Sequence, residues 1–395
     1  MSTAEWRRSA ETLQRSELFV ARRAGRFLLV ELLAPHRVLS TSAECGGERE
    51  DVAFLANHQS CEATGDAVRY NRIAELGQTA YHRAVCEEMG VAADRTAVMA
   101  TAANMAYAVH RAAGFDELRV DAFVTAGVAG NATRAGDPAH WLEAEDGRWQ
   151  RVAADAAGVQ TPDTEPRDGT INTMLLVNRP LTPAAQARAV VTMTEAKSAA
   201  LAELAAPSRQ SPTIATGTGT DQFCLAAPLD PRRTPKAATG PHTKLGELIG
   251  RAVLDAVKEA LRWQNGLEPS LTRGLFHALG RFGLTERRAL ERLAELLPAE
   301  QYALLDKNRN AAFYEPGVAA AAYAFAAVLD RRAFGTLPEG VAGETLRQQA
   351  ACLACALAAR PGDWPAFHAA LREAPDEPVE LALRALAAGW IAKWT

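Results

Sequence analysis

The chain changes character near residue 263, and this change constrains the fold more than any other feature of the sequence. Before that point, short runs typical of strands alternate with longer runs typical of helices. After it, only helical periodicity is present. The sequence therefore predicts an α/β domain over residues 1–262, built on a mixed sheet flanked by helices, and an all-α domain over residues 263–395.

Individual elements follow from the periodicity and from the turn residues between them. The strands expected in the first domain are 27–33, 51–55, 96–100, 118–126, 171–177 and 222–227. The helices expected there are 67–89, 104–113, 182–205 and one capped by Thr243, whereas 143–168 and 228–241 are expected to be loops. In the second domain the main helices expected are 285–297, 316–332, 341–360 and 378–393.

Composition excludes several classes of partner. Lys and Arg total 43 and Asp and Glu total 47, a net charge of −4, which is too mild to indicate binding to nucleic acid. The apolar run 318–329 is too short to cross a membrane. Six scattered cysteines and no secretory leader favour a cytoplasmic protein. Cys352 and Cys355 have zinc-like spacing but lie in a helical pattern without a second pair, so no metal site is expected.

Two glycine-containing stretches follow expected strands. Gly46 and Gly47 permit close approach of the backbone to a ligand, or simply a turn. Asn131 follows strand 118–126 at its carboxyl end, the edge at which open α/β sheets bind ligands. Its amide could donate a hydrogen bond to an oxyanion, or the residue could occupy a left-handed turn. Both alternatives stay open on the sequence alone.

Two threonine-containing stretches come at the starts of strands. Thr170 and Asn172 share one face of strand 171–177, so that face must meet either a hydrogen-bond network or a ligand. In ATGTGTD, residues 215–221, alternating glycines and threonines bring N–H groups and hydroxyls near one acceptor, and Asp221 adds a carboxylate. The stretch lacks the Gly-Lys-Ser/Thr of a Walker loop, and a strand rather than a helix follows it, which excludes a dinucleotide fingerprint.

Lys197 gives the clearest geometric signal. At 100° per residue it falls on an apolar stripe of helix 182–205, where an unpaired ammonium is costly. A carboxylate or a cleft is therefore expected opposite it, and Asp221 is the partner we predict. The alternative is a lysine that extends from the edge of the stripe into solvent. Glu195, two residues earlier, points to a different face of the helix.

Of the eight histidines, His58 and His242 have polar, loop-like sequence contexts. His242 precedes a predicted helix start, where the helix dipole favours the neutral imidazole, so this ring could act as a base or a ligand.

Five motifs together resemble the adenosylcobinamide amidohydrolase family (CbiZ). They are TAGV with Asn131-Ala132, then GTIN at 169–172, TEAK at 194–197, ATGTGTD at 215–221 and GPHTKLG at 240–246. The resemblance covers residues 27–262 and implies hydrolysis of the amide that joins the aminopropanol arm to the corrin ring, which gives adenosylcobyric acid for salvage. It implies a cobalt corrinoid as substrate, and no separate cofactor is expected.

The resemblance and the residue types together suggest roles. Asp221 or Glu195 is a candidate base, and Lys197, Asn131 and His242 are further catalytic candidates. Candidate substrate-binding residues are Thr170, Asn172, Gly217, Thr218, Gly219, Thr220, Gly46, Gly47 and His58.

The chain departs from the family pattern in two places, the insertion-like stretch 143–168 and the helical part after 263. These leave two alternatives open: a paralogous amidohydrolase acting on a non-corrinoid amide, or a non-catalytic corrinoid-binding protein in which His58 ligates cobalt. The layout of 169–185 and 216–228 is also similar to that of self-processing aminopeptidases of the DmpA type. That second likeness implies a layered αββα sandwich and makes Thr170 a candidate nucleophile.

Overall fold

A computed structural model describes residues 10–63, 65–152, 169–375 and 377–394. The chain divides into two compact units, Met1–Leu267 and Glu268–Thr395. The sequence placed this division after residue 262, within the last turn of α5 (Lys244–Asn265), which belongs to the first unit.

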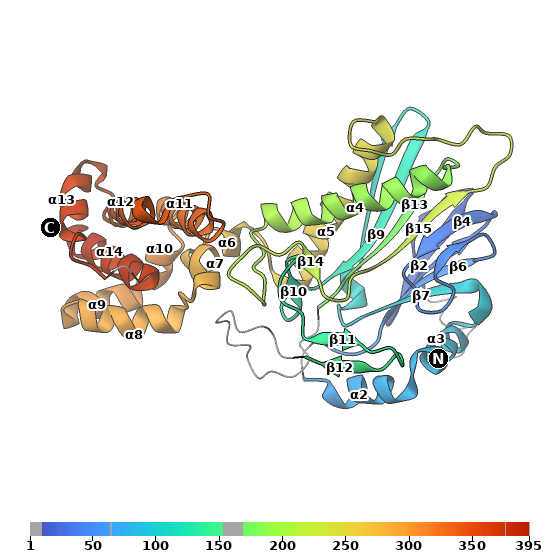
Figure 1. Ribbon diagram of the computed structural model, residues 1–395, viewed down its shortest axis with the longest axis horizontal. Helices are drawn as coiled ribbons and strands as arrows, with labels where there is room; N and C mark the ends of the chain where they lie inside the picture. Colours follow the sequence, from blue (N-terminus) through green and yellow to red (C-terminus); the bar gives the residue numbers. More distant parts are fainter. Residues whose placement is uncertain (1–9, 64, 153–168, 376, 395) are drawn as a thin grey trace. The chain divides into compact units, whose positions relative to one another are not determined.

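Two sheets pack face to face in the first unit (Figure 1). The six-stranded sheet has the order β5 (Gly47–Arg49), β4 (His36–Ser40), β15 (Gln222–Pro228), β13 (Ile171–Val177), β9 (Leu118–Ala126), β8 (Val109–Phe115). The five-stranded sheet has the order β1 (Glu11–Arg15), β2 (Phe19–Ala24), β3 (Phe27–Leu32), β6 (Phe54–Gln59), β7 (Thr96–Thr101). Phe123 and Met174 of the first sheet meet Leu28 and Met99 of the second in the core between them.

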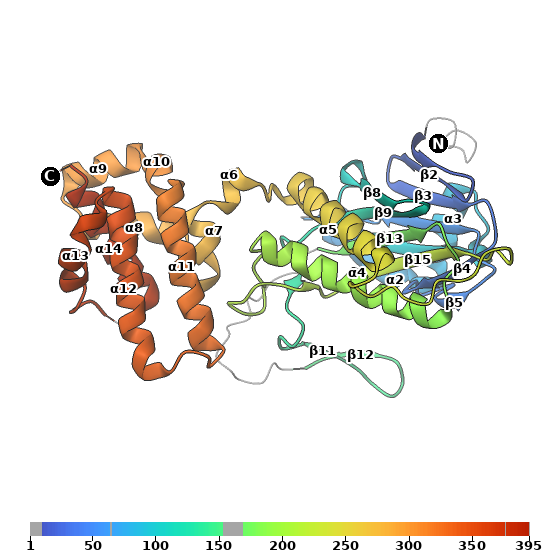
Figure 2. The ribbon, with the colours of Figure 1, turned by 90° about the horizontal axis from the view of Figure 1, so that it is seen from above.

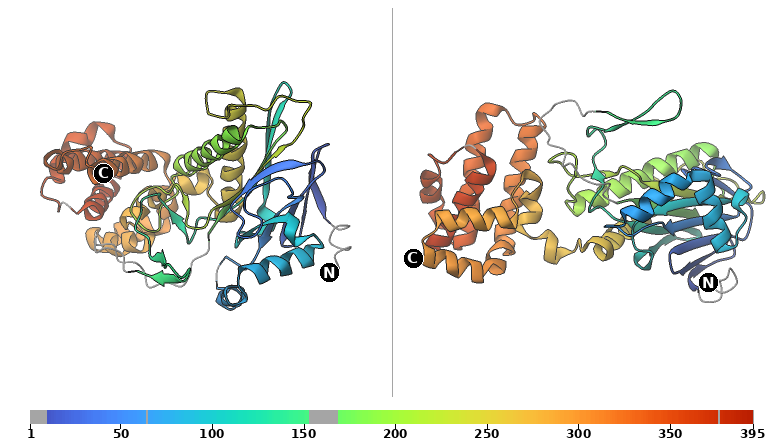
Figure 3. Two further views of the ribbon diagram at one scale, coloured as in Figure 1. Left: turned by 45° about the vertical axis from the view of Figure 1, so that its right-hand side comes forward. Right: turned by 90° about the horizontal axis from the view of Figure 1, so that it is seen from below.

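Helices cover both outer faces. α4 (Pro183–Glu203) and α5 bury their apolar sides against the six-stranded sheet (Figure 2). α3 (Gln78–Met89), which follows α2 (Ala67–Leu76), buries Val85 and Met89 against the five-stranded sheet (Figure 3). The unit is therefore a mixed-sheet sandwich with helices outside, and the predicted fold class is confirmed in its layered αββα form.

Local sequence explains where the two long helices start. Thr182 accepts a hydrogen bond from the Ala185 amide, and Pro183 occupies the first helical position, where its missing N–H costs nothing. Thr243 caps α5 by accepting a hydrogen bond from the Gly246 amide, and the apolar positions of α5 form one buried stripe.

Several predictions about elements were wrong or incomplete. Residues 104–113 do not form an α-helix: Met105–Tyr107 is a single 3-10 turn, and β8 then pairs with β9 as an edge strand, where sheet pairing outweighs the helical preference of its alanines. Residues 67–89 form two helices because Gly77 adopts φ +80° between them. Strand 51–55 is displaced to 54–59, and strands β1, β2 and β4 were not anticipated.

The stretch 143–168 is not loop throughout. β11 (Trp141–Glu143) and β12 (Trp149–Arg151) form a hairpin, and 153–168 lie outside the described residues. A second small pair joins β10 (Ala132–Thr133) to β14 (Gly217–Thr218).

The second unit is helical in its described residues. Its helices are α6 (Pro269–Thr272), α7 (Leu275–Leu279), α8 (Glu286–Leu296), α9 (Ala299–Lys307), α10 (Arg309–Phe313), α11 (Pro316–Ala333), α12 (Glu339–Ala358), α13 (Trp364–Ala370) and α14 (Pro378–Ala392). They enclose a core of their own that contains Cys355. No helix among the described residues of the chain is long and apolar enough to span a membrane.

Candidate active site

Four segments that are distant in sequence meet at one end of the six-stranded sheet. β13 and β15 are parallel and both begin there, whereas β9 runs antiparallel to β13 and ends there. α4 connects β13 to the segment before β15. The sequence predicted the carboxyl edge of an open sheet. In this mixed sheet, Thr170 and Asp221 instead lie at the amino ends of their strands, beside the carboxyl end of β9.

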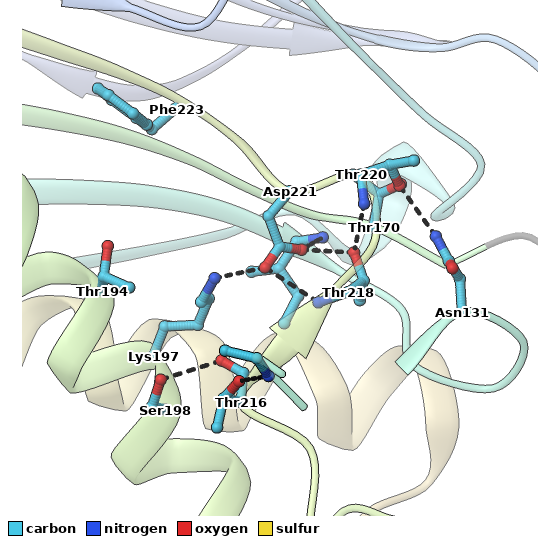
Figure 4. A network of polar contacts seen from close by, with 12 residues as sticks. Asn131, Thr170, Thr194, Lys197, Ser198, Thr216, Thr218, Thr220, Asp221 and Phe223 are labelled. Carbon is cyan, nitrogen blue, oxygen red and sulfur yellow. Dashed lines mark hydrogen bonds and ion pairs between the residues drawn. The ribbon is translucent and has the colours of Figure 1, made fainter. Parts of the chain in front are cut away.

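Lys197 and Asp221 form an ion pair at this edge. Nζ of Lys197, on α4, donates to Oδ2 of Asp221, and each side chain is 16% exposed (Figure 4). The buried residues of α4 include Met193, Ala196 and Leu201, so the lysine lies beside an apolar face. The predicted pairing is therefore present, and the lysine does not extend freely into solvent.

The carboxylate of Asp221 is held from several directions. Its Oδ1 accepts from the Ile171 amide at 3.0 Å and from Oγ1 of Thr218 at 2.5 Å, and its Oδ2 accepts from the Thr218 amide at 3.1 Å as well as from Lys197. Four donors thus fix the orientation of this group. A Cβ atom at Gly217 would lie 2.5 Å from Oδ2 of Asp221 and 2.8 Å from Nζ of Lys197, so only glycine leaves room for the pair.

A second cluster lies next to this ion pair. Oγ1 of Thr220 lies 2.6 Å from Oγ1 of Thr170 and donates to the carbonyl oxygen of Gly169 at 3.1 Å. Nδ2 of Asn131 donates to the same carbonyl at 3.1 Å and to Oγ1 of Thr220 at 3.2 Å (Figure 4). The structure therefore brings together seven predicted site residues: Lys197, Asp221, Gly217, Thr218, Thr170, Thr220 and Asn131.

Asn172 belongs to a network between the two sheets. It is fully buried, and its Nδ2 donates to Oδ1 of Asn57 and to the Ala100 carbonyl, each at 2.9 Å. Nδ2 of Asn57 donates in turn to Oγ1 of Thr125 at 2.8 Å. The predicted polar face of β13 thus meets a hydrogen-bond network. Asn57 was not anticipated, because its partner comes from the other sheet.

The end of α5 supports the loop that carries Asn131. Oδ1 of Asn265 accepts from the Val128 amide at 3.0 Å, and Oε1 of Gln264 accepts from the Asn104 amide at 2.9 Å. Sequence reasoning missed both residues. The only available signal was their position at the end of a long amphipathic helix.

Two catalytic candidates lie away from this cluster. Glu195 is exposed, and its nearest cation is Arg188, at 3.9 Å. His242 is exposed beside the start of α5, whose Lys244 lies over the ring of Phe115 on the hairpin between β8 and β9. That hairpin is at the opposite end of the sheet from Asp221, because β9 runs from the hairpin to the site.

Three binding candidates also lie apart. Gly46 and Gly47 lie at the start of edge strand β5, which β4 separates from β15. His58 is in strand β6 rather than a loop. Its ring stacks on Phe27 at 4.8 Å, and its Nδ1 lies 2.6 Å from the hydroxyl of Tyr81, on the side of the sheet covered by α3. Burial, together with Arg26 and Arg69, lowers the pKa of His58 to about 3.

Metal ligands do not gather in the described part of the chain: no group of three or more His, Cys, Asp or Glu side chains could hold an ion there. The expectation that the protein needs no metal is not tested by this observation and stays a prediction.

The part of the chain that matches known proteins coincides with the first unit. Residues 9–269 match the sequence profile of the adenosylcobinamide amidohydrolase family, CbiZ. The uncharacterized protein MJ1613 of Methanocaldococcus jannaschii is 35% identical over 243 residues, which cover 61% of this chain and 88% of that protein. The PH0078 protein from Pyrococcus horikoshii OT3 is 12% identical to this chain, with a TM-score of 0.26. The match covers 64% of this chain and 82% of the PH0078 chain. A likeness this low supports no argument about fold or function. The profile match spans well over half of the sequence, and the chain therefore belongs to the adenosylcobinamide amidohydrolase family.

Proposed function

We propose that this protein hydrolyses the amide between the aminopropanol arm and the corrin ring of adenosylcobinamide, giving adenosylcobyric acid and aminopropanol. The observation that carries the proposal is the Lys197–Asp221 ion pair, which joins the TEAK and ATGTGTD motifs into one site at the edge of the sheet. The substrate brings its own cobalt, and the reaction needs no other cofactor.

The roles follow from the contacts. An amide is a poor electrophile, so its hydrolysis needs positive charge or hydrogen-bond donors at the oxygen that becomes negative in the tetrahedral intermediate. The ammonium of Lys197 supplies that charge, and Asp221 orients it. Because Asp221 already accepts four hydrogen bonds, it serves here as a positioning residue rather than as the base that takes a proton from the nucleophile.

Gly219 and Thr220 are exposed beside the buried Thr218, so the ATGTGTD loop presents its outer residues to the substrate. Polar loop atoms of this kind suit the carboxamide arms at the rim of a corrin ring, which both donate and accept hydrogen bonds. We therefore keep Gly219 and Thr220 as substrate-binding residues in the proposal, whereas the buried Gly217 and Thr218 hold the ion pair.

The test is turnover of the purified full-length chain with adenosylcobinamide, a complete cobamide and a simple amide, followed by release of aminopropanol. The expected result is release from adenosylcobinamide, with a loss of about 10²-fold or more in Lys197→Met. Lys258→Met is the matched control, since Lys258 forms an exposed ion pair with Glu203 on another helix.

Two outcomes would contradict the proposal. Binding of the corrinoid without release of aminopropanol would indicate a corrinoid-binding protein. Release from the simple amide, with no spectral change on adding any corrinoid, would indicate an amidohydrolase of different specificity.

A further inference from the structure

The β11–β12 hairpin buries neither of its faces. All six of its strand residues are exposed, including Trp141 at 61% and Trp149 at 64%. A two-stranded hairpin without a covered apolar face is marginally stable on its own. Tryptophans in such a setting are typical of a binding surface, because a large ring gains most when a ligand or a partner covers it.

The strand register gathers the two tryptophans on one face. Trp141 lies opposite Arg151 in the hairpin. Glu143, two residues after Trp141, lies opposite Trp149. Because opposed residues share a face, and residues two apart on a strand do so as well, these four side chains form one face of the hairpin, the tryptophan face.

The hairpin has a defined shape although no core supports it. The Ala144 amide donates to the Arg148 carbonyl at 2.9 Å, and Gly147 closes the turn with φ +77°. Oδ1 of Asp146 accepts from the Arg148 amide at 3.0 Å. The tryptophan face is therefore carried by an ordered ribbon.

The root of this ribbon is joined to the candidate active site. Asn131 leads directly into β10, and β10 pairs with β14, which supports the Lys197–Asp221 ion pair. Between β10 and β11, Oδ2 of Asp137 accepts from Oγ of Ser208 at 2.6 Å and so fixes the connection. Figure 1 shows the hairpin continuing from β10. A substrate bound at the ion pair is thus bordered by the segment that carries the tryptophan face.

The tryptophan face has the groups that recognise a purine base. Indole rings stack on flat heteroaromatic rings. The carboxylate of Glu143 can accept a hydrogen bond from an exocyclic amino group, and the guanidinium of Arg151 can donate to ring nitrogens. Neither side chain forms an ion pair with another described residue, so both are available to a ligand.

Within an adenosylated cobalt corrinoid, the adenine base matches this face best. The corrin ring is bordered by methyl and carboxamide groups, which hinder close stacking on its faces. Adenine instead offers an unhindered flat ring with one amino group and several ring-nitrogen acceptors. Bases taken out of a helix are bound by proteins in the same way, by stacking on aromatic side chains and by hydrogen bonds at the base edge.

We propose that the tryptophan face binds the adenine base of the adenosyl group while the scissile amide lies at the Lys197–Asp221 ion pair. This inference rests on the proposed function. It gives the protein a second point of attachment on the same substrate, and binding energy gained at the adenine helps to hold the amide against the ammonium of Lys197. It also gives a function to the hairpin, which lies where the chain departs from the family pattern.

The test compares turnover of adenosylcobinamide with turnover of a cobinamide that carries cyanide in place of the adenosyl group, using the purified full-length chain. Trp141→Ala and Trp149→Ala should each lower kcat/KM for adenosylcobinamide by about 10-fold, the usual effect of losing one stacking contact with a base. Turnover of the cyanide form should not change. Trp394→Ala is the matched control, since Trp394 is also 61% exposed but belongs to the second unit.

A second measurement does not depend on turnover. Saturation transfer in NMR spectra, from the protein to the adenine protons of 5′-deoxyadenosine, should be seen with the wild-type chain and with Trp394→Ala. The double variant Trp141→Ala/Trp149→Ala should lose it. Circular dichroism of the double variant shows whether it is folded, and misfolding is not expected because both side chains are exposed.

Several results would overturn the inference. Equal losses of turnover on both corrinoids would assign the tryptophan face to the corrin ring, and a concentration-dependent dimer that the double variant loses would assign it to a second copy of the chain. Hydrolysis of adenosylcobinamide with an unchanged preference in both single variants would refute adenine binding but leave the proposed function standing. Binding of 5′-deoxyadenosine that the double variant loses, without hydrolysis of any corrinoid, would do the reverse.

Discussion

Asp221→Asn is the most informative single substitution, because the contacts of the carboxylate define its consequences atom by atom. The asparagine Oδ1 can still accept from the Ile171 amide and Oγ1 of Thr218. Its NH2 group, however, would face two donors, Nζ of Lys197 and the Thr218 amide. The ammonium then has no counterion while its side chain is only 16% exposed.

Removing one partner of a buried ion pair costs about 3–5 kcal/mol, and the remaining exposure puts this pair near the lower limit, at about 3 kcal/mol. If Lys197 also stabilises the transition state, turnover per folded molecule should fall by about 10²–10⁴-fold in both Asp221→Asn and Lys197→Met. The assay is a urea midpoint and a turnover rate measured on the same preparations.

The double variant separates catalysis from stability. Lys197→Met combined with Asp221→Asn removes the uncompensated charge, so stability should partly recover while turnover stays low. Single variants that are destabilised but keep the wild-type rate per folded molecule would show a purely structural ion pair. Both single variants stable and near the wild-type rate would refute the reasoning and remove the pair from the site.

Four further outcomes are expected. A fragment ending at residue 267 should fold and keep its turnover, whereas one ending at 262 should have a lower melting temperature because it lacks the two side chains of α5 that bind loop amides; equal melting temperatures would contradict this. Gly217→Ala should lower turnover at least as much as Lys197→Met, since the added Cβ would lie 2.8 Å from Nζ of the lysine; a wild-type rate would contradict it. Because the pKa of His58 is lowered from 6.5 to about 3, the folded chain binds fewer protons than the unfolded chain between these pH values. The free energy of unfolding should therefore fall by about 1.4 kcal/mol for each unit by which the pH is lowered across that window. In urea titrations, His58→Gln should lose this contribution to the pH dependence of the free energy of unfolding. Chelation should leave turnover unchanged, and loss that one divalent ion restores would disprove the absence of a metal requirement.

Part of this site could be predicted because its signals are local. Strands 118–126 and 171–177 were predicted with their observed bounds, since alternation in one and an apolar run in the other are properties of the segments themselves. The pairing of Lys197 with Asp221 could be inferred from the cost of an ammonium on an apolar stripe, without knowledge of the sheet order.

The remainder depends on strand register and on contacts between distant segments. Nothing near Asn57 in the sequence indicates that it meets Asn172, because their contact requires two sheets to pack face to face. Likewise Asn265 acts on the loop after β9 only because α5 packs along β9 and ends beside that loop. His242 was predicted as a catalytic candidate from its polar sequence context. That context does not show at which end of the sheet the residue lies.

The amino ends of two parallel strands explain why the site forms at this edge. The first amide of β13, that of Ile171, needs an acceptor and finds it in the carboxylate of Asp221, which lies immediately before β15 and also accepts from the amide of Thr218 in β14. The carboxylate therefore satisfies the backbone and the ammonium of Lys197 at once, which fixes the lysine without further support. The neighbouring carbonyl of Gly169 is satisfied differently, by hydrogen bonds from the side chains of Asn131 and Thr220. The start of β13 is thus held at its first amide by the Asp221 carboxylate and at the Gly169 carbonyl by the side chains of Asn131 and Thr220.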